Sequence, residues 1–296
     1  MASELTANDE QIRQIQDYID QMPSLSTTVT KVMEVCNQPN TSPNDLNRVV
    51  SLDPVLTGQV LKLINSAYYS LSNQVTSLTR AIIMLGLNTV KNLALSTAVL
   101  GSLSKEKSQC LDMTRFWNHS LCVGVTAKAL AVQQKISADV HEEYFVAGLL
   151  HDLGKIPLSN CFADGYRQAL ELSWIQKCSL LRAEQMIFGF DHCFVGKLIA
   201  EKWKLSPPIT DTLVRHHYTD NFKDSENMVK TVAMANIYAN IFEIGSAGDQ
   251  YQEVVEINDI IETSGISWVN ITAIEDKIAT EIDNAQVFLQ IAGGVN

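Results

Sequence analysis

The sequence contains few of the residues that interrupt regular structure or cross-link a chain. Only 7 prolines and 14 glycines are spread over 296 residues, and 46% of the residues are hydrophobic. This composition excludes an extended disordered protein and provides enough apolar material for a folded interior. None of the 6 cysteines forms a Cys-x-x-Cys pair. The pattern therefore favours reduced, packed thiols in a reducing cytoplasm over disulfides or a zinc–thiolate site.

Long apolar segments and positive charge are also scarce. No run of 18 or more apolar residues occurs, and no basic N-terminus precedes an apolar segment. We therefore expect a cytoplasmic protein without a membrane partner or an obvious export signal. The net charge is −11, and residues 221–296 contain 3 Lys and Arg against 12 Asp and Glu. This segment is either a solvated acidic face or a docking surface for a basic partner, and no nucleic-acid partner is expected.

Apolar residues recur at helical spacing along almost the whole chain, and no alternating pattern persists, so the sequence predicts an all-α fold without a sheet. The length favours two packed helical subdomains. A polar break at residues 101–108 predicts a boundary between a subdomain at 1–104 and a second at 105–296, which ends in an acidic helical extension. Beyond this break we expect helices at 112–134, 139–153, 163–176, 180–203, 206–217, 224–244, 256–263 and 270–292.

Histidines and one Asp form a second pattern. His151-Asp152 ends an apolar helix, His119 lies on another helix, and two further histidine positions follow at His192 and His216-His217. Taken singly, each histidine is more often a hydrogen-bonded core or surface residue than a ligand. Imidazole and carboxylate ligands together suit iron, manganese, zinc or nickel. Such an ion acidifies a bound water and polarises a phosphoryl oxygen, which is the chemistry of phosphoester hydrolysis.

The first half contains four ordered blocks that carry a family resemblance: Met22-Pro23-Ser24-Leu25, Asp53-Pro54-Val55-Leu56, Leu63-Ile64-Asn65-Ser66-Ala67 and the segment 81–87. Over about residues 15–220 the chain resembles the HDOD family, a relative of the HD superfamily of metal-dependent phosphohydrolases. The resemblance implies a bacterial signal-transduction protein whose second subdomain is an HD-domain-like helical bundle.

The same resemblance, particularly to the HD-GYP-like branch, assigns roles to the histidine pattern. It implies that His217 supports the site or binds a second ion, and that His192 follows an acidic position at Glu184. Lys155 is either a cation that meets substrate phosphate or a solvated charge at a helix end. If the protein is an enzyme, Asp152 and Lys155 are the implied catalytic residues. The implied metal ligands are His119, His151, Asp152, His192, His216 and Asn236.

Two departures from the superfamily weaken an enzymatic interpretation. Asn236 stands where the superfamily has its closing Asp, which removes a negative charge that helps to hold a metal. The Gly-Tyr-Pro loop typical of cyclic-di-GMP hydrolases is absent after His217, where Tyr218 follows instead. Hydrolysis of cyclic-di-GMP is therefore poorly supported.

Three hypotheses remain open at this point. The first is a regulatory module that binds signalling proteins or a small nucleotide-like ligand and still holds a divalent metal at a partly degenerate HD site. The second is a metal-dependent phosphohydrolase that acts on a nucleotide or phosphodiester. The third is a structural scaffold in which the polar cluster forms a self-contained hydrogen-bond network.

Overall fold

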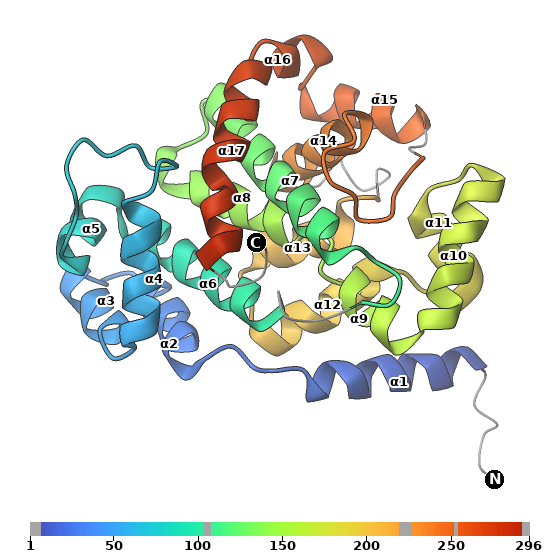
Figure 1. The fold of residues 1–296 in the computed structure, drawn as a ribbon, viewed down its shortest axis with the longest axis horizontal. Coiled ribbons are helices and arrows are strands. Elements are labelled where there is room, and N and C mark those ends of the chain that lie inside the picture. Colours follow the sequence, from blue (N-terminus) through green and yellow to red (C-terminus); the bar gives the residue numbers. More distant parts are fainter. Residues whose placement is uncertain (1–6, 104–107, 219–226, 252–253, 292–296) are drawn as a thin grey trace. The chain divides into compact units, whose positions relative to one another are not determined.

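The computed structural model describes residues 7–103, 108–218, 227–251 and 254–291. These residues form helices joined by turns and loops, and no strand occurs among them (Figure 1). The all-α prediction is therefore confirmed. The boundary that the sequence predicts between residues 104 and 105 falls outside the described residues and stays a prediction.

Contacts divide the chain into two compact units, each built from three separate segments. Unit 1 comprises Met1–Pro23, Lys107–Val123 and Ala147–Ser267. Unit 2 comprises Ser24–Glu106, Gly124–Val146 and Trp268–Asn296. Two helices, α7 (Met113–Gln133) and α8 (His141–Leu150), contribute residues to both units.

Unit 2 contains the helices of the first half of the chain and the C-terminal helix. Helices α2, α4 and α5 pack against the mostly buried α6, and α17 packs against α4 and α6. The remaining helices of this unit are α3 and α16 and the short 3₁₀ helix η1. Their bounds are α2 Thr27–Cys36, α3 Pro43–Val50, α4 Pro54–Ile64, α5 Leu78–Leu85, α6 Leu87–Leu103, η1 Ala138–Val140, α16 Trp268–Thr272 and α17 Glu275–Ile291.

Local capping explains where the helices of unit 2 begin. Ser42 and Asp45 form a reciprocal capping box at the start of α3, in which each side chain accepts a hydrogen bond from the other residue's backbone amide. Asp53 caps α4 by accepting from the amide of Leu56 at 2.9 Å. Each cap satisfies an amide that has no partner within the helix. Helices α3 and α4 accordingly begin at Pro43 and Pro54.

Unit 1 contains α1 and the helices from α9 to α15. Helix α1 packs against α9 and α12 (Figure 1). The indole Nε1 of Trp203 donates to the carbonyl of Pro23 at 3.1 Å. Helices α10 and α11 pack against each other, as do α12 with α13 and α13 with α14. Their bounds are α1 Ala7–Gln21, α9 Lys155–Cys161, α10 Ala163–Gln176, α11 Leu180–Phe188, α12 His192–Trp203, α13 Pro207–Arg215, α14 Asn227–Ile241 and α15 Val254–Ser264.

The helix expected at 180–203 is two helices, and this expectation was wrong. Gly189 ends α11 in the left-handed conformation with φ +74°, which a residue with a Cβ rarely adopts. Asp191 then caps α12 by accepting from the amide of Phe194 at 3.1 Å. The break matters for the site, because it makes His192 the first residue of a helix.

No single helix in the described part of the chain is long and apolar enough to cross a membrane. Helices α5 and α6 meet the length and composition requirement only as a pair, and they are bent by 116° at their junction. Most residues of α6 are buried inside unit 2.

Candidate metal centre

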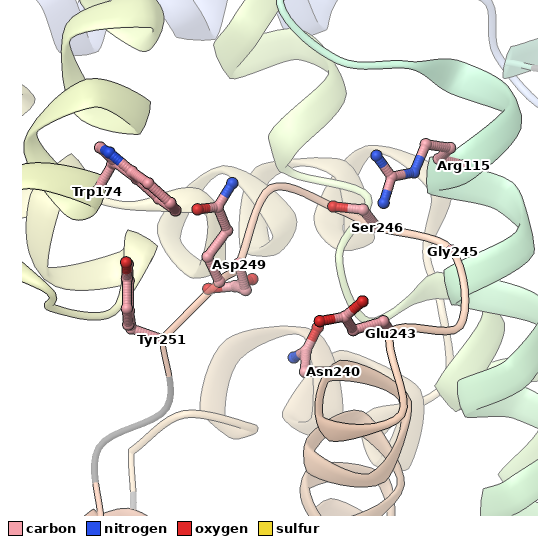
Figure 2. Close-up of a pocket in the computed structure, with 9 residues that line it drawn as sticks. Arg115, Trp174, Asn240, Glu243, Gly245, Ser246, Asp249 and Tyr251 are labelled. Carbon is pink, nitrogen blue, oxygen red and sulfur yellow. The ribbon is translucent and has the colours of Figure 1, made fainter.

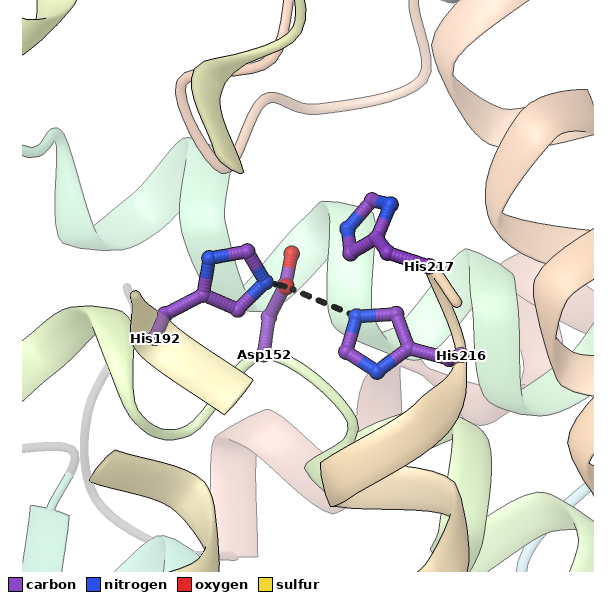
Figure 3. Close-up of side chains that lie close together, drawn as sticks. All are labelled: Asp152, His192, His216 and His217. Atoms are coloured by element: carbon purple, nitrogen blue, oxygen red, sulfur yellow. Dashed lines mark ion pairs between the residues drawn. The ribbon is translucent and has the colours of Figure 1, made fainter. Parts of the chain in front are cut away.

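A group of histidines in unit 1 surrounds one buried carboxylate, that of Asp152. Its Oδ2 lies 3.2 Å from Nε2 of His151 and 3.8 Å from Nε2 of His119. Its Oδ1 lies 3.3 Å from Nε2 of His192 and 3.5 Å from Nε2 of His216 (Figure 3). All five side chains are at most 1% exposed to solvent. The sequence separates these residues, and the fold brings them together.

Each histidine reaches the cluster from a different element. His119 lies within α7, His192 begins α12, and His216 follows the last residue of α13. His151 and Asp152 lie in the tight turn between α8 and α9. The helix expected at 139–153 therefore ends earlier than expected, and this turn directs both side chains of the pair to one place.

Hydrogen bonds at the opposite ring nitrogen orient three of these imidazoles. Nδ1 of His151 bonds to the carbonyl of Gly148 at 2.7 Å, and Nδ1 of His216 bonds to the carbonyl of Thr212 at 2.9 Å. Since a carbonyl only accepts, each Nδ1 carries the proton, which leaves Nε2 as a bare lone pair in the neutral ring. A histidine that binds a metal is held in this way.

Glu184 performs the same task for His192. Its Oε2 accepts from the backbone amide of His192 at 2.9 Å and from Nδ1 of the same residue at 2.6 Å. Glu184 is fully buried on α11, so the carboxylate fixes both the start of α12 and the direction of the ring. The family resemblance pointed to this acidic position, and the structure places it against His192.

The atoms that face one another in the cluster do not form hydrogen bonds. A buried polar atom without a partner costs about 1–3 kcal/mol, so such a concentration is unusual in a folded protein. A divalent ion would use these lone pairs, and the donor set therefore fits a metal. The unpaired atoms are Nε2 of His151, His192, His216 and His217, both ring nitrogens of His119, and Oδ1 of Asp152.

The possible ligands fall into two groups that share Asp152. One group contains Asp152, His192, His216 and His217, and the other contains His119, His151 and Asp152. Within each group, the ligand atoms lie within 4.8 Å of one another. His217, which the sequence left as a supporting residue or a ligand of a second ion, thus lies beside His192 and His216 (Figure 3).

Burial and neighbouring charges set the protonation of the cluster. Burial alone would raise the pKa of Asp152, but His151 and Lys155 outweigh it and hold this pKa well below its usual value. Burial would lower the pKa of His192, whereas the carboxylate of Glu184 raises it well above normal. Without a metal, the cluster thus combines a carboxylate whose pKa is lowered with a histidine whose pKa is raised.

Lys155 is fully buried and lies between two carboxylates. Its ammonium donates to Oδ2 of Asp152 at 2.8 Å and to Oδ2 of Asp249. Burial would lower the pKa of Lys155, but the two aspartates raise it. The solvated charge at a helix end that the sequence allowed is therefore wrong, because the side chain has no exposure. A contact between Lys155 and substrate phosphate stays a prediction.

Asp249 is a member of this arrangement that sequence reasoning missed. It lies in the loop after α14 and is 6% exposed, with Oδ1 unpaired. The acidic last quarter was interpreted as a surface, and Asp249 is an exception to that interpretation. The one available signal was its position directly after Gly248 in a segment with two glycines.

Asn236 lies on α14 and is buried. Its Oδ1 accepts a hydrogen bond from Nδ2 of Asn240 at 3.0 Å, so the oxygen that a metal would use has another partner. Its role as a ligand stays a prediction. His141 begins α8, where Nε2 bonds to the carbonyl of Ile136, and it belongs to neither ligand group.

A glycine brings the turn at 151–154 into direct contact with the start of α12. A Cβ at Gly154 would lie 2.0 Å from the carbonyl oxygen of His192 and 2.7 Å from the amide of Gly196. Both contacts are with backbone, which cannot rotate away. The absence of a side chain at Gly154 therefore sets how closely His192 approaches Asp152.

We predict that Gly154→Ala lowers the free energy of unfolding by about 2 kcal/mol, as is typical of an overpacked interior, and therefore lowers the urea midpoint. Gly58→Ala is the matched control, because a Cβ at Gly58 in α4 meets nothing within 4 Å. Alanine at that helical position should leave stability unchanged or raise it by up to about 1 kcal/mol. Equal midpoints for the two variants would contradict the close approach of Gly154 to His192.

We predict that the metal-free protein loses stability as the pH falls below 6.5. Burial lowers the pKa of His119 to about 3 and that of His216 to about 4, from a usual value of 6.5, and it holds that of His217 well below normal. Below pH 6.5 the unfolded chain therefore binds protons that the folded chain does not. Each such histidine lowers the free energy of unfolding by up to about 1.4 kcal/mol per pH unit.

The measurement is urea unfolding in EDTA at pH 7, 6 and 5. His217→Gln removes one of the three histidines, so it should reduce the slope of stability against pH. A free energy of unfolding that stays constant over this range would contradict the prediction.

Comparisons with known proteins agree with this fold. A family model for the HDOD domain matches residues 22–219. A solved HDOD domain protein of unknown function from Geobacter sulfurreducens is similar at 24% identity and a TM-score of 0.75, over 95% of this chain and 98% of that one. A Shewanella amazonensis SB2B protein that carries a phosphohydrolase name is similar at 21% identity and a TM-score of 0.71, over 94% and 98%. At these identities the likeness shows the fold alone.

One relative is longer than this chain. A Treponema pallidum (strain Nichols) protein, described as uncharacterized, is 25% identical over 227 residues, which are 75% of this chain and 43% of that protein. This chain thus spans less than half the length of that relative. The HDOD model, by contrast, covers well over half of this chain, including the first HDOD-like block and the paired histidines. The chain belongs to the HDOD family.

Proposed function

We propose that this HDOD protein binds divalent metal at the histidine cluster of unit 1 and acts as a regulatory module of bacterial signal transduction. The observation that carries the proposal is the convergence of unpaired Nε2 atoms on the buried carboxylate of Asp152. His151, His192 and His216 have Nδ1 anchored elsewhere, which leaves Nε2 for a metal. Ligands of this kind suit manganese, iron, zinc or nickel.

A self-contained hydrogen-bond network explains the cluster less well. Such a network gains stability only when its members satisfy one another, and a partly satisfied one is worse than an apolar core. In this cluster the facing nitrogens lack partners. Two ligand groups that share Asp152 favour a centre of two ions, with His119 and His151 on one side of that carboxylate.

Two features support a regulatory role over an enzymatic one. The ammonium of Lys155 lies 2.8 Å from Oδ2 of Asp152, and this cation offsets part of the carboxylate charge that a bound metal would use. Asn236 supplies no charge where the HD superfamily has an Asp. Both features lower the negative charge available to a metal, and they favour a centre that organises structure or senses metal.

We predict that EDTA-treated protein binds manganese, with up to two ions per chain. His192→Ala removes a ligand, and Glu184→Gln weakens the hydrogen bond that orients His192. Losing a ligand-orienting partner typically costs 10–100-fold in metal affinity, so we expect roughly that loss for Glu184→Gln. His141→Gln removes a histidine outside both ligand groups and should leave the affinity unchanged.

Isothermal titration calorimetry and elemental analysis of the dialysed protein measure the affinity and the number of ions. Circular dichroism establishes that each variant is folded. Absence of bound manganese, iron, zinc and nickel would contradict the proposal. So would metal binding that His192→Ala and Asp152→Asn leave intact.

Phosphohydrolase activity is a second candidate, and the sharing of Asp152 by two ligand groups is the observation that favours it. Two bound ions would polarise a phosphoryl oxygen and acidify a water. If the protein is regulatory, we expect the manganese-loaded wild-type protein to hydrolyse bis(p-nitrophenyl) phosphate no faster than the Asp152→Asn variant does. Turnover that requires Asp152 and is retained in His141→Gln would establish the enzymatic function instead.

A further inference from the structure

A loop held tightly on α7 forms one side of a cavity in unit 1. Gly245 has φ +72°, and a Cβ there would lie 2.3 Å from the amide of His119 and 2.5 Å from the carbonyl of Arg115. The amide of Ser246 donates to the same carbonyl at 2.9 Å. These contacts fix the segment 245–251 beside α7 and the end of α14, and a cavity of about 330 Å³ lies along it (Figure 2).

Opposite charges line this cavity without neutralising each other. Arg115 and Glu243 both line it, and neither forms an ion pair with a described residue. Both are solvent-exposed, and they come from α7 and from the residues after α14. A ligand that carries one charge of each sign would therefore find a partner for both.

Two aromatic side chains, those of Trp174 and Tyr251, line another side of the cavity. The rings of Trp174 and Tyr251 have centroids 6.0 Å apart at an interplanar angle of 49°, and Trp174 is 61% exposed (Figure 2). Indole and phenol faces attract ammonium groups through their quadrupoles. A large exposed indole beside a polar cavity is otherwise unfavourable, because it leaves apolar area in water.

Asp249 adds a buried acceptor. One of its oxygens, Oδ2, accepts from the ammonium of Lys155, whereas Oδ1 is buried without a hydrogen-bond partner. An unpaired carboxylate oxygen is costly, so a ligand that brings an N–H donor gains a charge-assisted hydrogen bond. This requirement selects a primary ammonium over a quaternary one, which has no N–H.

We propose that this cavity binds a small zwitterion of the amino acid class. Its carboxylate pairs with the Arg115 guanidinium, and its ammonium donates to Asp249 and Glu243 beside the Trp174 ring. Electrostatics favour this ligand over a phosphate-bearing one, because two carboxylates line the cavity and the whole chain carries a charge of −11. The site uses no residue of the two metal-ligand groups, so the proposal goes beyond the proposed function.

The test is to titrate the full chain, in the presence of EDTA, with each of the twenty standard L-amino acids. Binding is monitored by tryptophan fluorescence and by calorimetry. At least one amino acid should bind saturably and change the emission. Its N-acetyl derivative, which lacks the ammonium, and its decarboxylated amine should both bind at least roughly tenfold more weakly, as loss of one charged hydrogen bond predicts. The absence of metal in this experiment separates its outcome from that of the metal proposal.

Variants locate the site. Arg115→Ala, Glu243→Gln and Asp249→Asn should each weaken binding roughly tenfold or more, and Trp174→Ala several-fold. Ile175→Ala and Arg167→Ala are matched controls on α10 that do not line the cavity, and they should bind normally. Asp249→Asn also removes a partner of Lys155 and can therefore unfold the protein. In that case Arg115→Ala and Glu243→Gln alone test whether the ligand binds in this cavity.

Three outcomes would overturn the proposal. One is that no amino acid binds at millimolar concentration. Another is that binding occurs but survives Arg115→Ala and Glu243→Gln. The third is that AMP or spermidine binds through these residues while the amino acids do not, which would assign the cavity to an anion or to a polyamine.

Discussion

The buried charge of Asp152 is the constraint on which unit 1 depends. A carboxylate with no solvent exposure is stable only if positive charge or donors surround it. Among the described residues, Lys155 supplies the one permanent cation in contact with it, and the other ion-pair neighbours are the imidazoles of His119, His151, His192 and His216. The positions of α7, α12 and α13 are therefore tied to one side chain in the turn between α8 and α9.

The fold class and the family could be predicted from the sequence because both depend on local patterns. The all-α class follows from helical periodicity, which is local, and the HDOD blocks are contiguous stretches of residues. His151-Asp152 is likewise a local pair that ends an apolar helix. Its partners His119, His192 and His216 were proposed only through resemblance, and the structure brings them to the same carboxylate.

Other parts depend on tertiary contacts that no local pattern records. The division of 180–203 into α11 and α12 follows from the left-handed conformation at Gly189, yet apolar residues continue across the break. Asp249 looked like one more acidic residue in an acidic segment, and its burial results from the docking of Gly245 on α7. The sequence also left Lys155 open between two roles, because its pairing with Asp249 joins residues 94 positions apart.

The close approach of Gly154 to the carbonyl of His192 has a consequence for how relatives of this protein should be compared. The His-Asp pair lies close to α12 because Gly154 has a hydrogen atom where any other residue has a Cβ. A relative that keeps every histidine but has a larger residue at this position would hold the His-Asp pair and the start of α12 further apart. Inventories of the proposed metal ligands across the family should therefore include this glycine, since a larger residue there would disturb the cluster without the loss of a single histidine.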